Sequence, residues 1–182
     1  MLVIGITGTL GAGKGTIVEY LVGKKDFAHF SVRQYLIEEM QRQGLKINRD
    51  NMVTTANRLR AKHSPSFIIE ELYAKAITQN KNAVIESIRT PGEIDFLKKQ
   101  GNFLLVAVDA DPEIRYERIK LRKSVTDRID FKTFLENEQR EMTTTDPNKQ
   151  NLRACIDRAD IKLLNNGTKE ELFHQLEKRM NL

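Results

Sequence analysis

The chain has 182 residues, a formal net charge of +5 and an isoelectric point of about 9.3. This length suits one domain and is sufficient to bury a core without disulfides or metals. A single cysteine excludes a disulfide framework within the chain and favours a reducing, cytoplasmic setting. No apolar run approaches the ~20 residues that a membrane-spanning helix needs, and the basic excess favours anionic ligands, either nucleotides or nucleic acid.

Five short apolar segments predict β-strands, and helical segments separate them. The strands are expected at residues 2–7, 27–30, 83–87, 103–109 and 161–165. Most are continuously apolar rather than alternating, which is typical of a parallel sheet that is buried on both faces. Strands that alternate with helices imply right-handed β-α-β crossovers. The sequence therefore predicts an α/β fold, in which a five-stranded parallel sheet carries helices on both faces in three layers.

Residues 8–16, GTLGAGKGT, follow the first predicted strand and contain four glycines and one charged side chain, that of Lys14. A tight turn needs one or two glycines, so four indicate that the backbone wraps closely around a ligand. Successive N–H groups that lead into a helix N-terminus bind anions, and the spacing of Gly8, Gly13 and Lys14 fits the phosphate-binding loop. The residues expected to bind the nucleotide are Gly8, Gly11, Ala12, Gly13, Lys14, Gly15 and Thr16.

Residues 16–25 supply the helix that a phosphate-binding loop requires, because Ile17 and Leu21 lie one turn apart. The residue after Lys14 is Gly15, where the general motif has serine or threonine, and the hydroxyl comes one position later at Thr16. This form of the loop resembles that of nucleoside monophosphate kinases such as adenylate kinase. The resemblance implies ATP and Mg²⁺ as cofactors, with Lys14 in a catalytic role and Thr16 as a magnesium ligand.

Charged side chains follow the second and third predicted strands, at the edge where a parallel sheet binds its ligands. Arg33 comes after the second strand, and Glu86 and Arg89 come at the end of the third. A single arginine in such a place is more often part of a surface ion pair. Two together favour a phosphate site, because arginine makes forked, charge-assisted contacts with phosphate.

Three further helices with capping residues at their N-termini are expected at residues 90–101, 111–123 and 168–180. Thr90 and Glu93 form a capping box at the first of these helices, and Thr168 and Glu171 form one at the third. These signals separate the last three strands and support the alternating pattern.

Four stretches resemble the adenylate-kinase family and come in the order in which that family has them. They are HFSVRQYLIEEM, AVIESIRTPGEIDFL, RYERIKLRK and ADIKLLNNGTKEEL. The resemblance implies that Arg33 and Arg89 hold the phosphate of the acceptor and that Arg89 is also catalytic. Glu86 is expected to orient hydrated magnesium and to lie beside the acceptor.

On the donor side, the same resemblance implies that Arg118 and Arg122 reach the triphosphate of ATP from a lid and act in catalysis. A solvated basic helix face is the alternative for these two side chains. Arg128 and residues 143–151 are expected either at the lid tip or in contact with the acceptor. Asn166 and Gly167 are expected near the adenine, as in nucleoside monophosphate kinases and in dephospho-coenzyme A kinase.

Two helical segments between the predicted strands are longer than a crossover requires, which divides the single domain, residues 1–182, into a core and two inserts. The core is expected at residues 1–30, 81–117 and 159–182, the acceptor-binding insert at 31–80 and the lid at 118–158. Within the first insert, residues 48–66 predict a polar amphipathic helix. This helix is expected either to cover the acceptor, with Asn57, Arg58 and Arg60, or to face solvent.

These residues predict a phosphotransferase that moves the γ-phosphate of ATP to a small phosphorylated acceptor, most of all a nucleoside or deoxynucleoside monophosphate. Ser31 stands where many relatives carry aspartate, which favours a phosphate acceptor, since such an acceptor needs no general base. Dephospho-coenzyme A kinase and a non-kinase ATP-binding module are the alternatives. The expected partners are ATP and the acceptor, with no nucleic acid and no membrane, for a cytoplasmic monomer or homodimer.

Overall fold

The structure, a computed structural model, describes residues 1–122 and 129–180, and a sheet of five parallel strands forms its centre. The strands are β1 (Val3–Gly8), β2 (Ala28–Ser31), β3 (Ala83–Glu86), β4 (Phe103–Asp109) and β5 (Ile161–Leu164). Their order across the sheet is β2-β3-β1-β4-β5, and each neighbouring pair is parallel. All five strands predicted from the sequence are confirmed, with small differences at their ends.

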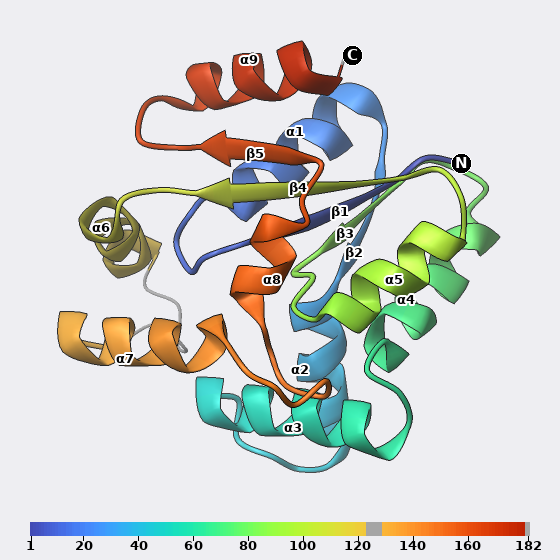
Figure 1. Ribbon diagram of the computed structural model, residues 1–182, viewed down its shortest axis with the longest axis vertical. Coiled ribbons are helices and arrows are strands. Elements are labelled where there is room, and N and C mark those ends of the chain that lie inside the picture. The colour runs from blue at the N-terminus through green and yellow to red at the C-terminus, as the bar shows by residue number, and fades with distance from the viewer. Residues whose placement is uncertain (123–128, 181–182) are drawn as a thin grey trace.

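Helices cover both faces of this sheet. They are α1 (Lys14–Lys25), α2 (Val32–Arg42), α3 (Arg49–Lys62), α4 (Phe67–Thr78), α5 (Pro91–Lys99), α6 (Pro112–Arg122), α7 (Phe131–Met142), α8 (Leu152–Asp157) and α9 (Lys169–Met180). Helices α1 and α9 lie on one face and α4, α5 and α8 on the other, whereas α6 and α7 lie beyond the carboxyl end of β4 (Figure 1). The predicted three-layer α/β fold is therefore confirmed.

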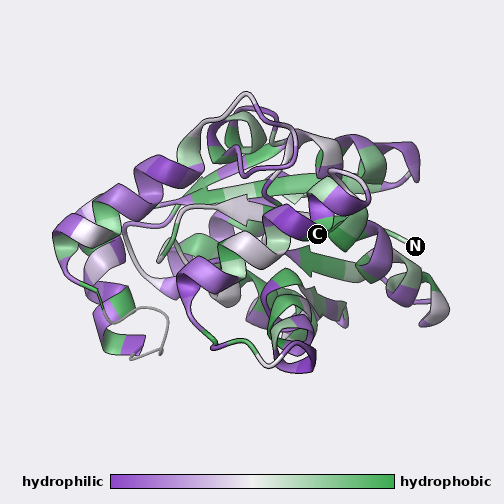
Figure 2. Cartoon of the chain, turned by 90° about the horizontal axis from the view of Figure 1, so that it is seen from below, coloured by the Kyte–Doolittle hydropathy of each residue, from purple (hydrophilic) through white to green (hydrophobic). Residues whose placement is uncertain are grey.

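The core consists of two clusters of buried side chains, one on each face of the sheet. Successive strand residues point to opposite faces. Ile4 and Ile6 pack with α1 and α9, whereas Val3, Ile85 and Leu105 pack with helices of the opposite layer. Because both faces are covered, the central strands β1, β3 and β4 are mostly apolar and buried, whereas the edge strands β2 and β5 also carry polar, exposed residues; green prevails along the sheet in Figure 2.

The two capping boxes predicted from the sequence are also confirmed. Oγ1 of Thr90 accepts a hydrogen bond from the backbone N–H of Glu93 at 3.2 Å, and the Thr90 N–H donates to Glu93 Oε2 at 3.1 Å. Thr168 and Glu171 make the same reciprocal pair, at 3.2 and 2.8 Å. These boxes set the starts of α5 and α9 and hence the exits of the chain from β3 and β5.

The connections after β1 and β3 leave the sheet toward opposite faces, because α1 and α5 lie on opposite sides. β1 and β3 are neighbours in the sheet. In open α/β sheets, ligands bind where the connections of two neighbouring strands diverge in this way. The strand order therefore brings the glycine-rich loop beside the residues that follow β3.

The two expected inserts pack differently along their lengths. Residues 31–80 form α2, α3 and α4, and Ile68 and Ile69 of α4 are fully buried in the core. In the second region, Cys155 of α8 is fully buried in the same core cluster, so this short helix packs as part of the core. Arg128, expected at the lid tip or in contact with the acceptor, lies outside the described residues. Among the described helices, none combines the length and the apolar character needed to cross a membrane.

Candidate active site

The loop between β1 and α1 has a shape that depends on its glycines. Gly13 caps α1 in the left-handed region, with a φ of 104°, and a Cβ there would lie 2.2 Å from Nδ2 of Asn165. Gly15 differs, because its φ lies outside that region and no described neighbour lies within 4 Å of the position of a Cβ. Gly15 lines a cavity at the first turn of α1. Its missing side chain leaves room for an anion next to N–H groups that have no partner within the helix.

Asn165 holds this loop in place, and the sequence analysis did not identify it. Its Nδ2 donates to the carbonyl of Ala12 at 2.8 Å, and its backbone N–H donates to the carbonyl of Asp109 at 2.8 Å. The described residues that line the cavity include Asn165 and Gly167 but not Asn166, the predicted asparagine. The sequence did contain a signal for Asn165. Buried and exposed residues alternate along β5, and this alternation makes position 165 a buried one.

Lys14 lies beneath the loop, where its ammonium group contacts backbone oxygens. Nζ donates to the carbonyls of Gly8 at 3.0 Å and Thr9 at 2.7 Å. Burial, and after it the charge of Arg89, lower the pKa of Lys14 from 10.5 to about 7. An anion beside Nζ would favour the charged form, so this amine is suited to bind a polyphosphate.

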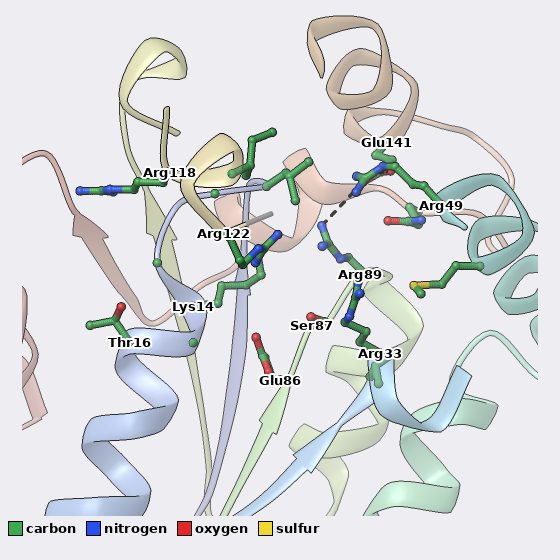
Figure 3. A pocket seen from close by; sticks show the side chains of 18 of the residues that line it. Lys14, Thr16, Arg33, Arg49, Glu86, Ser87, Arg89, Arg118, Arg122 and Glu141 are labelled. Carbon is green, nitrogen blue, oxygen red and sulfur yellow. Dashed lines mark hydrogen bonds and ion pairs between the residues drawn. The ribbon is translucent and has the colours of Figure 1, made fainter. Parts of the chain in front are cut away.

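One cavity of about 500 Å³ extends from the glycine-rich loop to α2 and α3. The described basic residues that line it are Lys14, Arg33, Arg49, Arg60, Arg89, Arg118, Arg122 and Lys169. The described acidic residues are Glu19, Glu86 and Glu141. Figure 3 shows side chains from the loop, from β3 and from α2 directed into this one space. The cavity therefore has a strong excess of positive charge, and it unites the loop with the residues at the strand ends.

Glu86 ends β3 and is one of the few acidic groups in the cavity. Its Oε2 lies 3.2 Å from Nε2 of His29 on the neighbouring strand. Burial raises the pKa of Glu86, but the hydrogen bond with His29 and the charge of Lys14 outweigh it, so the pKa lies below its ordinary value. Glu86 is thus an ionised carboxylate that faces the same space as Lys14.

The two arginines of α6 point in different directions. Figure 3 shows the guanidinium group of Arg122 beside Lys14, whereas Arg118 points away from that lysine and lies above Thr16 in the view. Nη1 of Arg118 is buried and has no hydrogen-bond partner among the described residues. The two side chains therefore line different parts of the cavity, and a shared role at the triphosphate of ATP stays a prediction.

On the side of the loop that faces α3 and α7, Arg89 lies close to a second arginine that the sequence analysis did not identify. Arg49, the first residue of α3, donates from Nη2 to Oε1 of Glu141 at 2.6 Å. Oε2 of the same carboxylate lies 4.0 Å from Nη1 of Arg89, which also donates to the carbonyl of Gly8 at 3.4 Å. The partner of Arg49 is 92 residues away in the chain, so no local pattern could reveal this contact.

Arg60 is in the cavity wall, but a buried ion pair occupies two of its nitrogens. Nε and Nη2 donate to Oε1 of Glu93 at 3.1 and 2.9 Å, and the two side chains are 1% and 0% exposed. Oε2 of Glu93 accepts the backbone N–H of Arg89 at 2.6 Å. Arg60 therefore connects α3 to the backbone of Arg89. The described lining residues do not include Asn57 or Arg58, which were expected with Arg60.

An apolar wall stands beside these cations. It is formed by α2 and α3, through Val32, Leu36, Met52, Val53 and Ala56. Aliphatic side chains favour contact with an apolar or flat group over contact with a hydroxyl-rich one. This end of the cavity is therefore suited to a ligand that joins an anionic group to an apolar face.

Comparisons with known proteins agree with this architecture. A family model described as AAA domain matches residues 4–144. A UPF0200 protein of Methanococcus maripaludis is 30% identical over 180 residues, which cover 97% of this chain and 94% of the relative. A UPF0200 protein of Methanococcus vannielii is 32% identical over 145 residues, or 78% of each chain.

Among solved structures, shikimate kinase from Bacteroides thetaiotaomicron is similar over 100% of this chain and 99% of its own, with a TM-score of 0.65 and 13% identity. A gluconokinase from Sinorhizobium meliloti is similar over 99% of this chain and 91% of its own, with a TM-score of 0.59 and 14% identity. The fold is that of P-loop kinases.

Proposed function

Because this chain belongs to the AAA-domain family and has the P-loop kinase fold, we propose that it transfers the γ-phosphoryl group of ATP to a phosphorylated small molecule, best matched by a nucleoside or deoxynucleoside monophosphate. One observation carries the proposal. Lys14 on the glycine-rich loop and Arg89 after β3 line the same cavity, although different segments supply them. Two cationic centres in one cavity suit two phosphate groups that must be aligned for transfer.

The donor end fits ATP in its shape and in its charge. The first turn of α1 offers backbone N–H groups, Lys14 adds an ammonium group and Gly15 leaves space. Arg122 lies beside Lys14 (Figure 3), where it would bind the transferring phosphoryl group, while Arg118 would contact the nucleoside part of the donor. Asn165 and Gly167 line the cavity on the same side of the loop.

The oxygen atoms that line the cavity also suit a magnesium ion. Thr16 and Glu86 both line the cavity and offer a hydroxyl and an ionised carboxylate, which are oxygen ligands of the kind that Mg²⁺ prefers. These two residues would hold the ion directly or through water. Bound Mg²⁺ supplies charge neutralisation at the β- and γ-phosphates.

The acceptor end favours a phosphate that is attached to a flat or apolar group. Arg33 and Arg89 would hold the phosphate, and the aliphatic wall of α2 and α3 would contact a base. Ser31 offers no carboxylate as a general base, and its hydroxyl already accepts the N–H of Gln34 at 3.2 Å as the N-cap of α2. An acceptor phosphate needs no deprotonation and is consistent with this arrangement.

A hydroxyl acceptor is the second candidate, and Glu86 is the observation that favours it. This carboxylate is ionised and lines the cavity, so it could take a proton from an alcohol. Dephospho-coenzyme A is the acceptor of this kind that combines a hydroxyl with an anionic group and a base. The hydrogen bond with His29 already occupies one oxygen of the Glu86 carboxylate, so the hydroxyl acceptor ranks second.

The test is an ADP-release assay across all ribonucleoside and deoxyribonucleoside monophosphates and dephospho-coenzyme A. We expect turnover with at least one monophosphate. Arg33→Ala and Arg89→Ala should each lower kcat/KM for that acceptor about a hundredfold, with little change in the KM for ATP below pH 7, where Lys14 is already charged. Arg42→Ala is the matched control, since Arg42 lies on α2 with its side chain 66% exposed.

The outcomes separate the candidates. Turnover with dephospho-coenzyme A alone would support the hydroxyl acceptor. No ADP release with any member of the panel, combined with a nucleic-acid affinity that falls steeply with salt, would instead support a non-kinase ATP-binding module.

A further inference from the structure

Glu141, one residue before the end of α7, is a buried carboxylate in a cavity that mainly gathers cations. Its side chain is 6% exposed. Oε1 accepts a hydrogen bond from Nη2 of Arg49 at 2.6 Å, and Oε2 lies 4.0 Å from Nη1 of Arg89 (Figure 3). One carboxylate therefore joins three segments that are distant in the sequence, namely the start of α3, the end of α7 and the loop after β3.

The position of Glu141 balances a repulsion that the fold itself creates. The side chains of Arg49 and Arg89 are only 17% and 15% exposed, so water screens their charges poorly. The two guanidinium groups approach the same carboxylate, so their positive charges repel each other. A carboxylate between them offsets that repulsion and restricts their rotamers, whereas its removal would leave two buried cations without their shared partner.

Glu141 does not occupy all the donors of the two arginines. A guanidinium group has five N–H donors. Nε of Arg49 is buried and has no hydrogen-bond partner among the described residues. In Arg89, it is Nη1 that lies 4.0 Å from Oε2 of Glu141, and the same nitrogen donates to the Gly8 carbonyl at 3.4 Å. Both side chains thus keep donors for an anion in the cavity that they line.

We propose that Glu141 is a positioning residue, which holds Arg49 and Arg89 side by side as a paired site for the phosphate of the acceptor. Arg49 is then a further acceptor-binding residue. The inference rests on the proposed function, because the phosphate it describes is that of the phosphorylated acceptor. It extends the acceptor site from the two arginines at the strand ends to a third, which α7 holds through its carboxylate.

The effect of Glu141→Gln distinguishes positioning from simple electrostatics, since the two predict opposite signs. If Glu141 contributed only its charge, removing that charge would make the cavity more positive and would strengthen anion binding. If Glu141 orients the arginines, the amide cannot hold two cations, and acceptor binding weakens although the cavity has become more positive.

We expect Glu141→Gln to raise the KM of the acceptor found in the panel by about tenfold, the scale of one charge-assisted hydrogen bond, with the KM for ATP within about twofold. Asp50→Asn is the matched control. Asp50 also connects α3 to α7, through Arg140 at 3.2 Å, but its side chain is 80% exposed and lies outside the described cavity wall. This control should leave both KM values unchanged.

A second variant covers the case in which Glu141→Gln fails to fold. Arg49→Lys keeps the positive charge but loses Nε and the planar fork. It should raise the acceptor KM to a similar extent, and the double variant with Glu141→Gln should add little, because Glu141 acts through the arginines. An acceptor KM that is unchanged or lower in both single variants would overturn the proposal.

A binding measurement separates failure of this inference from failure of the proposed function. The glycine-rich loop is first saturated with Mg²⁺ and a non-hydrolysable ATP analogue, and inorganic phosphate is then titrated while arginine Nε–H signals are followed by NMR. Wild-type protein should show saturable shifts of the Arg49 and Arg89 signals, and Glu141→Gln should weaken the phosphate affinity several-fold. Equal or tighter phosphate binding in Glu141→Gln overturns the paired site, even if the panel finds an acceptor. If no member of the panel releases ADP but Glu141→Gln weakens phosphate binding as expected, only the proposed acceptor class is rejected and the paired site stands.

Discussion

The donor end of the cavity and its acceptor end are built in different ways. At the donor end, the loop and Lys14 form a continuous segment, and the lysine contacts carbonyls five and six residues away. At the acceptor end, the important contacts are Arg49 with Glu141 and Arg60 with Glu93, which are 92 and 33 residues apart. The lysine and the N–H groups of the donor end thus come from one local motif, although Asn165 holds that loop from 153 residues away, whereas the acceptor end depends on ion pairs between distant segments.

The two ends should therefore respond differently to the substitution of a single side chain. A local motif should lose activity when a side chain is changed and should keep its fold. A site held by buried ion pairs between distant segments should lose stability as well, because each broken pair leaves an uncompensated charge.

Lys14→Met tests the donor half of this comparison and should have the largest effect. We expect kcat to fall at least about 10³-fold, because the charge that stabilises the transferring phosphoryl group is lost. The melting temperature should stay equal or rise, since burial disfavours the charged lysine in the folded state. Kinetics and thermal unfolding measure the two effects.

Lys24→Met is the control for Lys14→Met, because Lys24 lies on the same helix and is exposed. It should change neither activity nor melting temperature. Near-normal turnover of Lys14→Met would contradict the assignment of the loop.

The contrast between the two ends also explains how far the sequence could predict the molecule. Most strands are apolar along their length, and the capping box of Thr90 and Glu93 lies within four residues, so both signals are local. The same holds for the glycine-rich loop. Fold class, strand positions and helix starts were therefore predictable from the sequence.

The acceptor end was predictable only in part. Arg33 and Arg89 follow strands, and the rule that ligands bind at strand ends places them near the loop. Arg49 and Glu141 have no such signal, since each looks like an ordinary polar helix residue until α3 and α7 meet. Arg60 was considered as an acceptor contact because of its charge, but its buried partner Glu93 was predicted only as a capping residue.

Arg60→Met tests the acceptor half of the comparison. Glu93 is fully buried, and its Oε1 would lose both donors of Arg60. We expect the free energy of unfolding to fall by about 3–5 kcal/mol, as for other buried pairs that lose one partner. Urea denaturation measures this loss.

Arg58→Met is the matched control for Arg60→Met, because Arg58 lies on the same helix and is exposed. Its effect should stay within about 0.5 kcal/mol. The double variant Arg60→Met/Glu93→Gln should recover part of the loss, since the amide carries no buried charge. If Arg60→Met were as stable as the control, the acceptor end would not depend on this pair.

The smallest effect expected is a pH dependence that joins the two ends, because cations of the acceptor end act on the lysine of the donor end. Burial and Arg89 lower the pKa of Lys14 to about 7, and Arg49 contributes in the same direction. Below pH 7 the amine is already charged, so ATP affinity should be nearly independent of this group. Above pH 7 the free protein must take up a proton when the polyphosphate binds, and affinity should fall by up to about tenfold per pH unit.

Calorimetry with Mg²⁺ and ATP at pH 8, in two buffers with different ionisation enthalpies, measures this proton uptake directly. We expect close to one proton per ATP at pH 8 and little at pH 6, with no uptake by the lysine in Lys14→Met. Arg49→Lys keeps the positive charge and should leave the uptake in place, whereas Arg49→Met removes it and should raise the pKa of Lys14 and reduce the uptake at pH 8. No proton uptake at pH 8 would contradict the lowered pKa of Lys14. An uptake that Arg49→Met leaves unchanged would mean that this acceptor cation does not act on the lysine, and the two ends would then be electrostatically separate.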